Sequence, residues 1–282
     1  MGSLFSLVLV SSVGALGSLV DTAAGMGFGA LSTTILVASG YAPATVVLSV
    51  NIAKVPGGIA GAVAHWRLGN IRRNWVIPLV ISGVIGGVTG AIYVTSMSPE
   101  LVRRIVPWLL IVMGVLIIRR AVNGRFQVSP PVAGGSAVTA IGDAPIVQHA
   151  RRRRRTARPL RDLWLYVIGF AAGALNSATG AFGPFATSGL ILARGRRPRH
   201  AIGTVTLVEV AVAAAVSITL LARIATSSSG IGWQLPAALT LGAVVAAPAG
   251  AWLSSRIPAR PLALSVGIVL ILINGIAIVR AG

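Results

Sequence analysis

The chain has 282 residues, of which 55% are apolar and 10% are charged, and its mean hydropathy is +0.87. A soluble domain carries about a quarter charged residues, so this composition excludes an ordinary soluble protein and indicates several membrane crossings. The net charge of +19 would favour nucleic-acid binding if the arginines shared one soluble face. They crowd the gaps between apolar runs instead, which is typical of cytoplasmic loops, with anionic lipid contact as a weaker reading.

The residue types that most enzymes need are scarce. No cysteine is present, which excludes disulfides, thiol catalysis and thiolate metal sites. His65, His149 and His200 each lie beside an arginine-rich gap without a second ligand at metal-binding spacing, so we expect no metal and no cofactor. The five acidic residues are scattered and the sequence has no P-loop, so neither an enzyme nor an ATP-driven pump is expected. The apolar N-terminus lacks a basic region and predicts a first membrane segment, not a cleaved signal.

Apolar segments follow one another in chain order, five before a polar stretch and five after it. The first five cover residues 3 to 20, 25 to 39, 43 to 64, 75 to 96 and 101 to 119; the second five cover 163 to 176, 181 to 193, 201 to 224, 233 to 253 and 261 to 280. Lipid offers no partner to free backbone groups, so we expect helices throughout and an all-α integral membrane protein. About 8 to 10 of them should be membrane helices, with one short Gly-broken segment in each half.

Residues 120 to 162 are rich in Pro, Gly, Ser and Arg and show no apolar period. They predict a cytoplasmic Arg-rich linker between a first membrane repeat, residues 1 to 119, and a second membrane repeat, residues 163 to 282. Counting segments from a cytoplasmic linker puts the other arginine-rich gaps inside and both termini outside. Arg103 and Arg104 are the exception, because they fall near the outer end of the fifth segment.

The two halves share residues at a constant spacing of 155 positions (209 − 54). At this spacing Asp21-Thr22 falls on Asn176-Ser177, Gly25 on Gly180, Gly40 on Gly195, Pro43 on Pro198, Ser49 on Thr204, Asn51 on Thr206 and Lys54 on Glu209. Equivalent loops of the halves fall on opposite sides of the membrane. The sequence therefore predicts two inverted repeats of about five segments each, an arrangement found in many secondary transporters.

Each half places a Gly-broken polar turn before a short apolar segment. The turns read DTAAGMGFG at residues 21 to 29 and NSATGAFGP at residues 176 to 184. The segments of about 15 and about 13 residues would span roughly 22 and 20 Å, less than the ~30 Å of hydrocarbon. Such interrupted segments at matching places mark the binding site of a transporter, and a helix N-terminus there favours an anion. The competing reading is that the glycines only allow close helix packing.

These patterns predict an anion site between the two turns, lined by the third segment of each half. Lys54 is the candidate counter-charge, and Asp21 and Glu209 are candidates for proton coupling. A structural Lys54–Glu209 ion pair is the alternative, and Asp21 would either pair with Lys54 or cap the short helix. The expected substrate-binding residues are Thr22, Gly25, Gly27, Gly29, Asn51, Lys54, Asn176, Ser177, Thr179, Gly180, Gly183, Thr204 and Thr206.

A Gly-rich turn after the first helix, a Pro-containing loop and a polar-dotted third helix in each half resemble the sulfite exporter TauE/SafE family of membrane permeases. The resemblance implies a multi-pass protein of the bacterial cytoplasmic (inner) membrane that exports sulfite, sulfoacetate or a related organosulfonate, coupled here to the proton gradient. Family turns are richer in consecutive glycine, and the linker here is long. Another small anion such as a carboxylate, or a membrane enzyme or assembly factor, are the alternatives. The expected partners are a small anion and the lipid bilayer, with no nucleic acid, and a homodimer is left open.

Overall fold

The computed structural model describes residues 2–25, 27–122, 158–194, 198–225, 232–253 and 259–281. Over these ranges the regular structure consists of ten α-helices, in the order that the apolar segments predict. They are α1 (Gly2–Ala24), α2 (Phe28–Ala38), α3 (Pro43–Arg67), α4 (Arg73–Ser96), α5 (Pro99–Val122), α6 (Arg158–Thr179), α7 (Gly183–Arg194), α8 (Pro198–Ala225), α9 (Gln234–Leu253) and α10 (Ala259–Ala281). The all-α prediction is confirmed.

Both ends of the predicted linker, residues 120–122 and 158–162, are helical, because α5 continues to Val122 and α6 begins at Arg158. Residues 123–157, which hold most of the predicted linker, lie outside the described residues.

Five helices of the described chain are long and apolar enough to cross a membrane. They cover Ser6–Ala24, Pro43–Arg67, Arg73–Ser96, Glu100–Val122 and His200–Arg223, and shorter apolar stretches cover Phe28–Ala38, Leu163–Thr179, Gln234–Gly250 and Ala263–Val279. Helices α2 and α7 have 11 and 12 residues. At ~1.5 Å per residue each is well short of the ~30 Å hydrocarbon layer, which confirms the two short segments.

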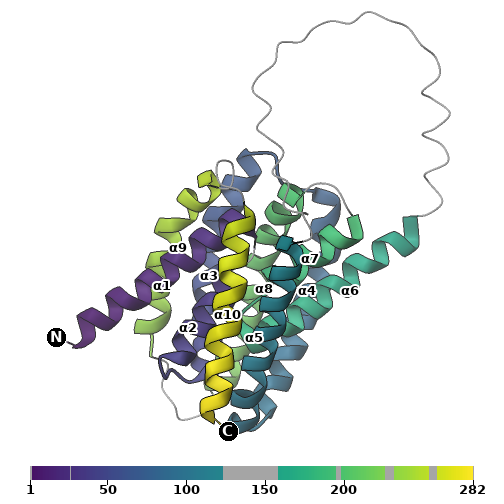
Figure 1. Ribbon diagram of the computed structural model, residues 1–282. Coiled ribbons are helices and arrows are strands. Elements are labelled where there is room, and N and C mark those ends of the chain that lie inside the picture. Colours follow the sequence, from purple (N-terminus) through teal and green to yellow (C-terminus); the bar gives the residue numbers. More distant parts are fainter. Residues whose placement is uncertain are drawn as a thin grey trace, which may run out of the picture.

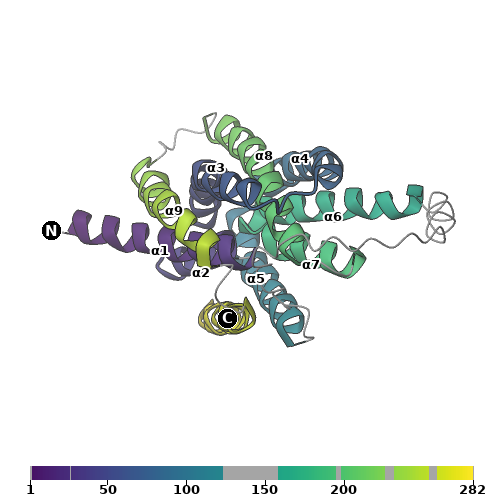
Figure 2. The ribbon, with the colours of Figure 1, turned by 90° about the horizontal axis from the view of Figure 1, so that it is seen from above.

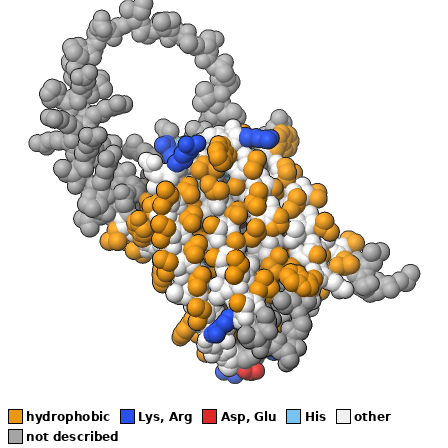
Figure 3. Space-filling view, turned by 180° about the vertical axis from the view of Figure 1, so that it is seen from behind, with side chains coloured by type: hydrophobic (Ala, Val, Ile, Leu, Met, Phe, Trp, Pro, Cys, Tyr) orange, Lys and Arg blue, Asp and Glu red, His pale blue; other side chains and the backbone are white. Residues whose placement is uncertain are grey.

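Apolar side chains cover the outside of the helix bundle. Val245 and Val279 are 77% and 81% exposed, and many other large apolar residues are more than a third exposed. Hydrophobic side chains cover the middle of the face in Figure 3, whereas Lys and Arg side chains lie toward its two ends. This surface suits a lipid environment, where exposed apolar groups carry no penalty.

Helices from the two halves interleave (Figure 1). The most extensive contacts join α1 with α9 and α4 with α6, followed by α5 with α10, α3 with α9, α3 with α8 and α4 with α8. Seen from above, α1 and α6 extend to opposite sides, and α3 and α8 lie between them (Figure 2). Neither half therefore forms its main contacts within itself.

Small residues allow the crossed helix pairs to approach closely. A Cβ atom at Gly14 of α1 would lie 2.4 Å from the carbonyl oxygen of Leu239 in α9. A Cβ atom at Gly169 of α6 would lie 3.0 Å from the carbonyl oxygen of Leu79 in α4. Backbone-to-backbone contact of this kind is how helices gain packing energy in lipid, where no hydrophobic effect drives them together.

The Gly-broken turns have the same geometry in both halves. Gly25 after α1 and Gly180 after α6 have φ values of +69° and +67°, which an L side chain rarely adopts. The N–H of Gly25 donates to the carbonyl of Asp21 at 2.6 Å, and the N–H of Gly180 donates to the carbonyl of Asn176 at 2.7 Å. Glycine therefore ends each long helix and lets the chain turn into the short one.

Candidate functional site

A buried ion pair joins the two third helices of the halves. Lys54 of α3 and Glu209 of α8 are each 5% exposed, and the Lys54 ammonium donates to the Glu209 carboxylate. The same Nζ donates to the carbonyl of Gly180 at 2.5 Å and to Oδ1 of Asn176 at 3.3 Å. The ion pair that the sequence left open as an alternative is therefore present, and the second Gly-broken turn supplies the other acceptors.

Two asparagines extend this polar group along α3 and α6. Nδ2 of Asn176 donates to Oδ1 of Asn51 at 2.7 Å, and Nδ2 of Asn51 donates to the carbonyl of Val47 at 2.8 Å. Each amide is thereby held in one orientation. Asn176 can then offer its oxygen to Lys54, which fixes the ammonium between α3, α6 and α8.

Asp21 lies at the N-terminus of the first short helix. Its carboxylate lies beside the backbone N–H groups of Gly27 and Phe28, where α2 begins. A Cβ atom at Gly183, the first residue of α7, would lie 3.4 Å from Oδ1 of Asp21. The sequence left open whether Asp21 caps the short helix or pairs with Lys54, and the structure places its carboxylate beside the first N–H groups of α2. The helix end predicted to attract an anion thus already holds a carboxylate of the protein.

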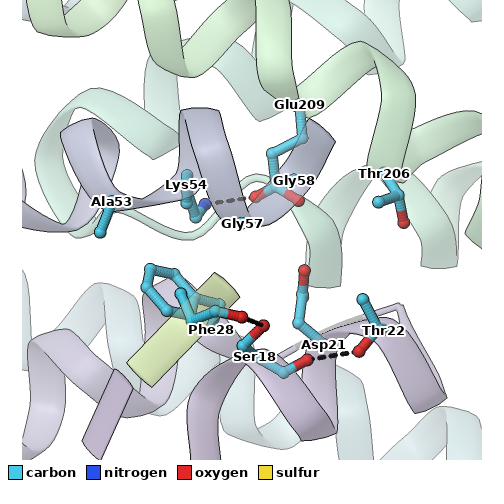
Figure 4. Close-up of a pocket in the computed structure, with 11 residues that line it drawn as sticks. Ser18, Asp21, Thr22, Phe28, Ala53, Lys54, Gly57, Gly58, Thr206 and Glu209 are labelled. Carbon is cyan, nitrogen blue, oxygen red and sulfur yellow. Dashed lines mark hydrogen bonds and ion pairs between the residues drawn. The ribbon is translucent and has the colours of Figure 1, made fainter. Parts of the chain in front are cut away.

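A small cavity lies between these charged groups. It has a volume of about 20 Å³, which is room for about one water molecule. In Figure 4 Asp21 points across the gap toward Glu209, and Thr22 and Thr206 lie to one side of it. The cavity is lined by Ser18, Asp21, Thr22, Phe28, Ala53, Lys54, Gly57, Gly58, Thr206, Glu209 and Ala243.

Five residues of the predicted site are in that lining: Asp21, Thr22, Lys54, Thr206 and Glu209. Asn176 and Gly180 accept hydrogen bonds from Lys54, which lines the cavity, and Asn51 accepts a hydrogen bond from Asn176.

The remaining predicted residues lie outside the cavity lining and make contacts within or between helices. The hydroxyls of Ser177 and Thr179 donate to the carbonyls of Gly87 and Leu175. The hydroxyl of Thr204 accepts the backbone N–H of Arg72. The glycines lie at close approaches: Gly25 meets Ile202, Gly27 meets Val20, Gly29 meets Gly180 and Gly183 meets Gly25.

Sequence reasoning missed the small residues that leave room for the cavity. Gly57 and Gly58 follow Lys54 by three and four positions, so they share its helix face, and Ser18 precedes Asp21 by three. Helical spacing from the charged residues was the signal that could have found them. Phe28 and Ala243 carried no such signal, because they come from α2 and α9.

Thr22 and Thr206 of the cavity lining both approach Gly61 of α3. A Cβ atom at Gly61 would lie 2.7 Å from Cγ2 of Thr22 and 3.3 Å from Cγ2 of Thr206. One helical turn farther along α3, His65 is 1% exposed, and its Nδ1 lies 3.4 Å from Nδ2 of Asn70. Among the described residues no group of three or more His, Cys, Asp or Glu side chains could hold a metal ion. His149 lies outside the described residues.

Comparison with known proteins places the chain in a family. The family model for the sulfite exporter TauE/SafE matches residues 10–276. The chain belongs to this family. The chain is also similar to the probable membrane transporter protein YtnM of Bacillus subtilis (strain 168), with 29% identity over 268 residues that cover 95% of this chain and 81% of that protein. No solved structure matches the chain at a significant level.

This TauE/SafE protein is therefore a multi-pass membrane transporter and not an enzyme, as the sequence predicts. The family membership that the sequence predicted is confirmed over residues 10–276.

Proposed function

We propose that the protein exports a small sulfur-containing anion, such as sulfite or sulfoacetate, across the bacterial inner membrane, and that Lys54 binds the anion. The name of the family supports the substrate class and the direction. The observation that carries the proposal is the ammonium of Lys54, buried between the two halves beside two carboxylates. A charge at membrane depth costs about 2.5 to 3.5 kcal/mol on insertion scales, so its retention indicates a use.

The cavity chemistry suits an oxyanion. Lys54 supplies charge, and the hydroxyls of Thr22 and Thr206 line the same cavity. Each hydroxyl donates to a carbonyl of its own helix, that of Ser18 or Ile202, so it would have to rotate before it could donate to an anion. At about 20 Å³ the cavity does not hold an anion of several heavy atoms. The threonine contact on Gly61 would have to separate to admit one. The Gly-broken turns beside it, where Gly25 and Gly180 end the long helices, are the places where the backbone can adjust.

A proton would accompany the anion. Glu209 and the anion compete for the Lys54 ammonium, so binding of the anion leaves Glu209 without its partner. A buried carboxylate without a partner costs several kcal/mol, and uptake of a proton by Glu209 removes that cost. Asp21, which lines the same cavity beside the N-terminus of α2, is the second candidate for the proton.

Outward movement follows from the charge balance. A dianion such as sulfite that leaves with one proton carries a net charge of −1 outward. An inside-negative membrane potential favours this step by about 2.3 kcal/mol per charge for each 100 mV. Export can therefore proceed even though a proton leaves with the anion.

We also propose that residues 1 to 119 and 163 to 282 form an inverted repeat around this site. If each helix of the first half is equivalent to the helix five places later, the α1–α9 contact corresponds to the α4–α6 contact, and the α3–α9 contact corresponds to the α4–α8 contact. All four contacts are present. Lys54 and Glu209, equivalent at the 155-residue spacing, contact each other. At the same spacing Asn51 is equivalent to Thr206, and Asn176 is equivalent to Asp21. Asn51 and Asn176 are joined by a hydrogen bond, whereas Thr206 and Asp21 line the cavity. One side of the site is therefore closed by a hydrogen bond, and the equivalent side contains the cavity.

Flux in proteoliposomes tests the proposed function. Vesicles that contain purified protein are loaded with radiolabelled sulfite, and efflux and internal pH are followed together. We expect sulfite efflux above that of protein-free vesicles, with a rise in internal pH and a faster rate when the vesicle interior is made negative. Sulfite efflux equal to that of protein-free vesicles would refute the assignment, and efflux of malonate without sulfite would move the substrate class to carboxylates.

A further inference from the structure

We propose a second oxyanion site, built by Arg103 and Arg104 at the end of the molecule that is predicted to face outward. These arginines are the exception to the positive-inside pattern, and the transport site does not use them. Both lie in a cavity of about 720 Å³, far larger than the central one. Its lining consists of Val37, Gly40, Tyr41, Ala42, Pro43, Arg103, Arg104, Pro107, Trp108, Ala277 and Ile278.

Three parts of the fold build this outer cavity. The first turns of α5 supply Arg103 and Arg104, the turn between α2 and α3 supplies one wall, and the last turns of α10 supply the other. Gly40 in the turn has a φ of +94°, and its N–H donates to the carbonyl of Val37 at 3.0 Å, so the wall is a closed, hydrogen-bonded turn. The walls of the outer cavity are therefore ordered parts of the fold: one hydrogen-bonded turn and the ends of two helices.

The two guanidinium groups are available for a ligand. Both arginines are exposed, and within the described part of the chain no ion pair joins either one to a carboxylate, although exposed Glu100 lies one turn earlier on α5. Two adjacent guanidinium groups present forked donors that match sulfonate, sulfite or phosphate oxygens. Tyr41, which is 36% exposed, adds an aromatic hydroxyl to the same lining.

The site is separate from the central cavity, because the two linings share no residue. Its oxyanion has two sources, a free sulfur-containing anion on its way through the membrane and the phosphate of a lipid head group. Trp108 is 58% exposed beside the arginines, and Trp and Tyr are enriched at the interface where lipid phosphates lie. The shared chemistry is a tetrahedral or pyramidal oxyanion that two guanidinium groups bind.

Binding measurements on purified protein separate the sources. One arm titrates delipidated protein in detergent with sulfite by calorimetry, and the other incubates it with phosphatidylglycerol and counts retained lipid by native mass spectrometry. The test variant is Arg103→Gln with Arg104→Gln, and the matched control is Arg119→Gln, an exposed arginine at the other end of α5. The variant Arg103→Lys with Arg104→Lys keeps the charge and removes the forks.

We expect at least a tenfold loss of sulfite binding or of lipid retention in the double Gln variant, an intermediate loss in the double Lys variant and no change in Arg119→Gln. Loss in the sulfite arm assigns a free anion, and loss in the lipid arm assigns a head group; both support the site. Wild-type values in both arms for the double Gln variant would overturn it. Because the readout is binding and the altered residues lie outside the central cavity, failure here leaves the proposed transport function untouched.

Discussion

The side chain of Lys54 has three acceptors from two helices and one turn: Glu209, Asn176 and the carbonyl of Gly180. Removal of the ammonium alone would strand a buried carboxylate, at a cost of about 3 to 5 kcal/mol. A single alanine substitution would therefore confuse loss of folding with loss of function. Neutral replacement of both members of the pair avoids this ambiguity.

We predict that Lys54→Met with Glu209→Gln folds but does not transport. Two neutral side chains of similar volume remove the unpaired charge, and replacement of a buried pair in this way is often neutral for stability. The elution profile and thermal midpoint in detergent should stay close to wild type, while sulfite flux falls to background. Lys54→Arg should retain partial flux, since its charge survives and its geometry changes. Wild-type flux in the neutral pair would exclude Lys54 as the anion ligand.

Glu209→Gln and Asp21→Asn separate the two candidate proton carriers. Asparagine at residue 21 keeps a side-chain oxygen beside the N–H groups of Gly27 and Phe28, so we expect the start of α2 to be preserved in Asp21→Asn. We expect Glu209→Gln to remove the rise in internal pH that accompanies sulfite efflux and Asp21→Asn to retain it. The reverse result would assign the proton to Asp21.

At the scale of the helices, glycines allow the closest approaches between elements. Among the described glycines, the closest approach is between Gly29 and Gly180, one in each Gly-broken turn. A Cβ atom at Gly29, in the first turn of α2, would lie 1.6 Å from the carbonyl oxygen of Gly180. That same carbonyl accepts a hydrogen bond from Lys54. Packing of the short helix and position of the charge are therefore coupled through one peptide group.

We predict that Gly29→Ala lowers the thermal midpoint and sulfite flux together. The added methyl group has to displace backbone, and overpacking of this kind costs about 1 to 3 kcal/mol or more. The matched control is Gly275→Ala in α10, where no heavy atom lies within 4 Å of the added Cβ and alanine gains up to about 1 kcal/mol of helix propensity. Equal midpoints for the two variants, measured by the temperature dependence of the elution peak, would contradict the close approach.

The molecule as a whole has two ends, and α3 joins them. Ser39 lies just before α3 and Leu68 just after it, and both are exposed. Positive charge at residues 67 to 74 predicts that Leu68 faces the cytoplasm and Ser39 the outside.

Whether the protein forms a homodimer is left open by the sequence. The mass of the protein–detergent complex, measured by light scattering, would check it.

We predict that cysteines introduced at Ser39 and Leu68 react from opposite sides of the membrane. The natural chain has no cysteine, so a membrane-impermeant maleimide reports only the introduced thiol. Ser39→Cys should react in intact cells, whereas Leu68→Cys should react only after permeabilisation. Reaction of both from one side would mean that α3 does not cross, and the reversed pattern would invert the predicted orientation.

Helix number, order and type were predictable from the sequence, because long unbroken apolar runs in lipid satisfy their backbone groups as helices, whereas a β-barrel needs short alternating segments. The two broken turns were predictable as well, since only glycine readily adopts the φ of Gly25 and Gly180. The charged residues of the site stood out for the same physical reason: Asp21, Lys54 and Glu209 are costly at apolar depth.

Tertiary structure alone decided which polar residues share a cavity. Thr22 and Ser177 are equivalent in the two halves, yet Thr22 lines the central cavity while the hydroxyl of Ser177 binds the carbonyl of Gly87. The pairing of Lys54 with Glu209 and the position of Asp21 beside the N-terminus of α2 depend on how α1, α3 and α8 cross. Sequence determines each helix through local backbone hydrogen bonding, but the position of a side chain between helices depends on close contacts made by residues far apart in the chain.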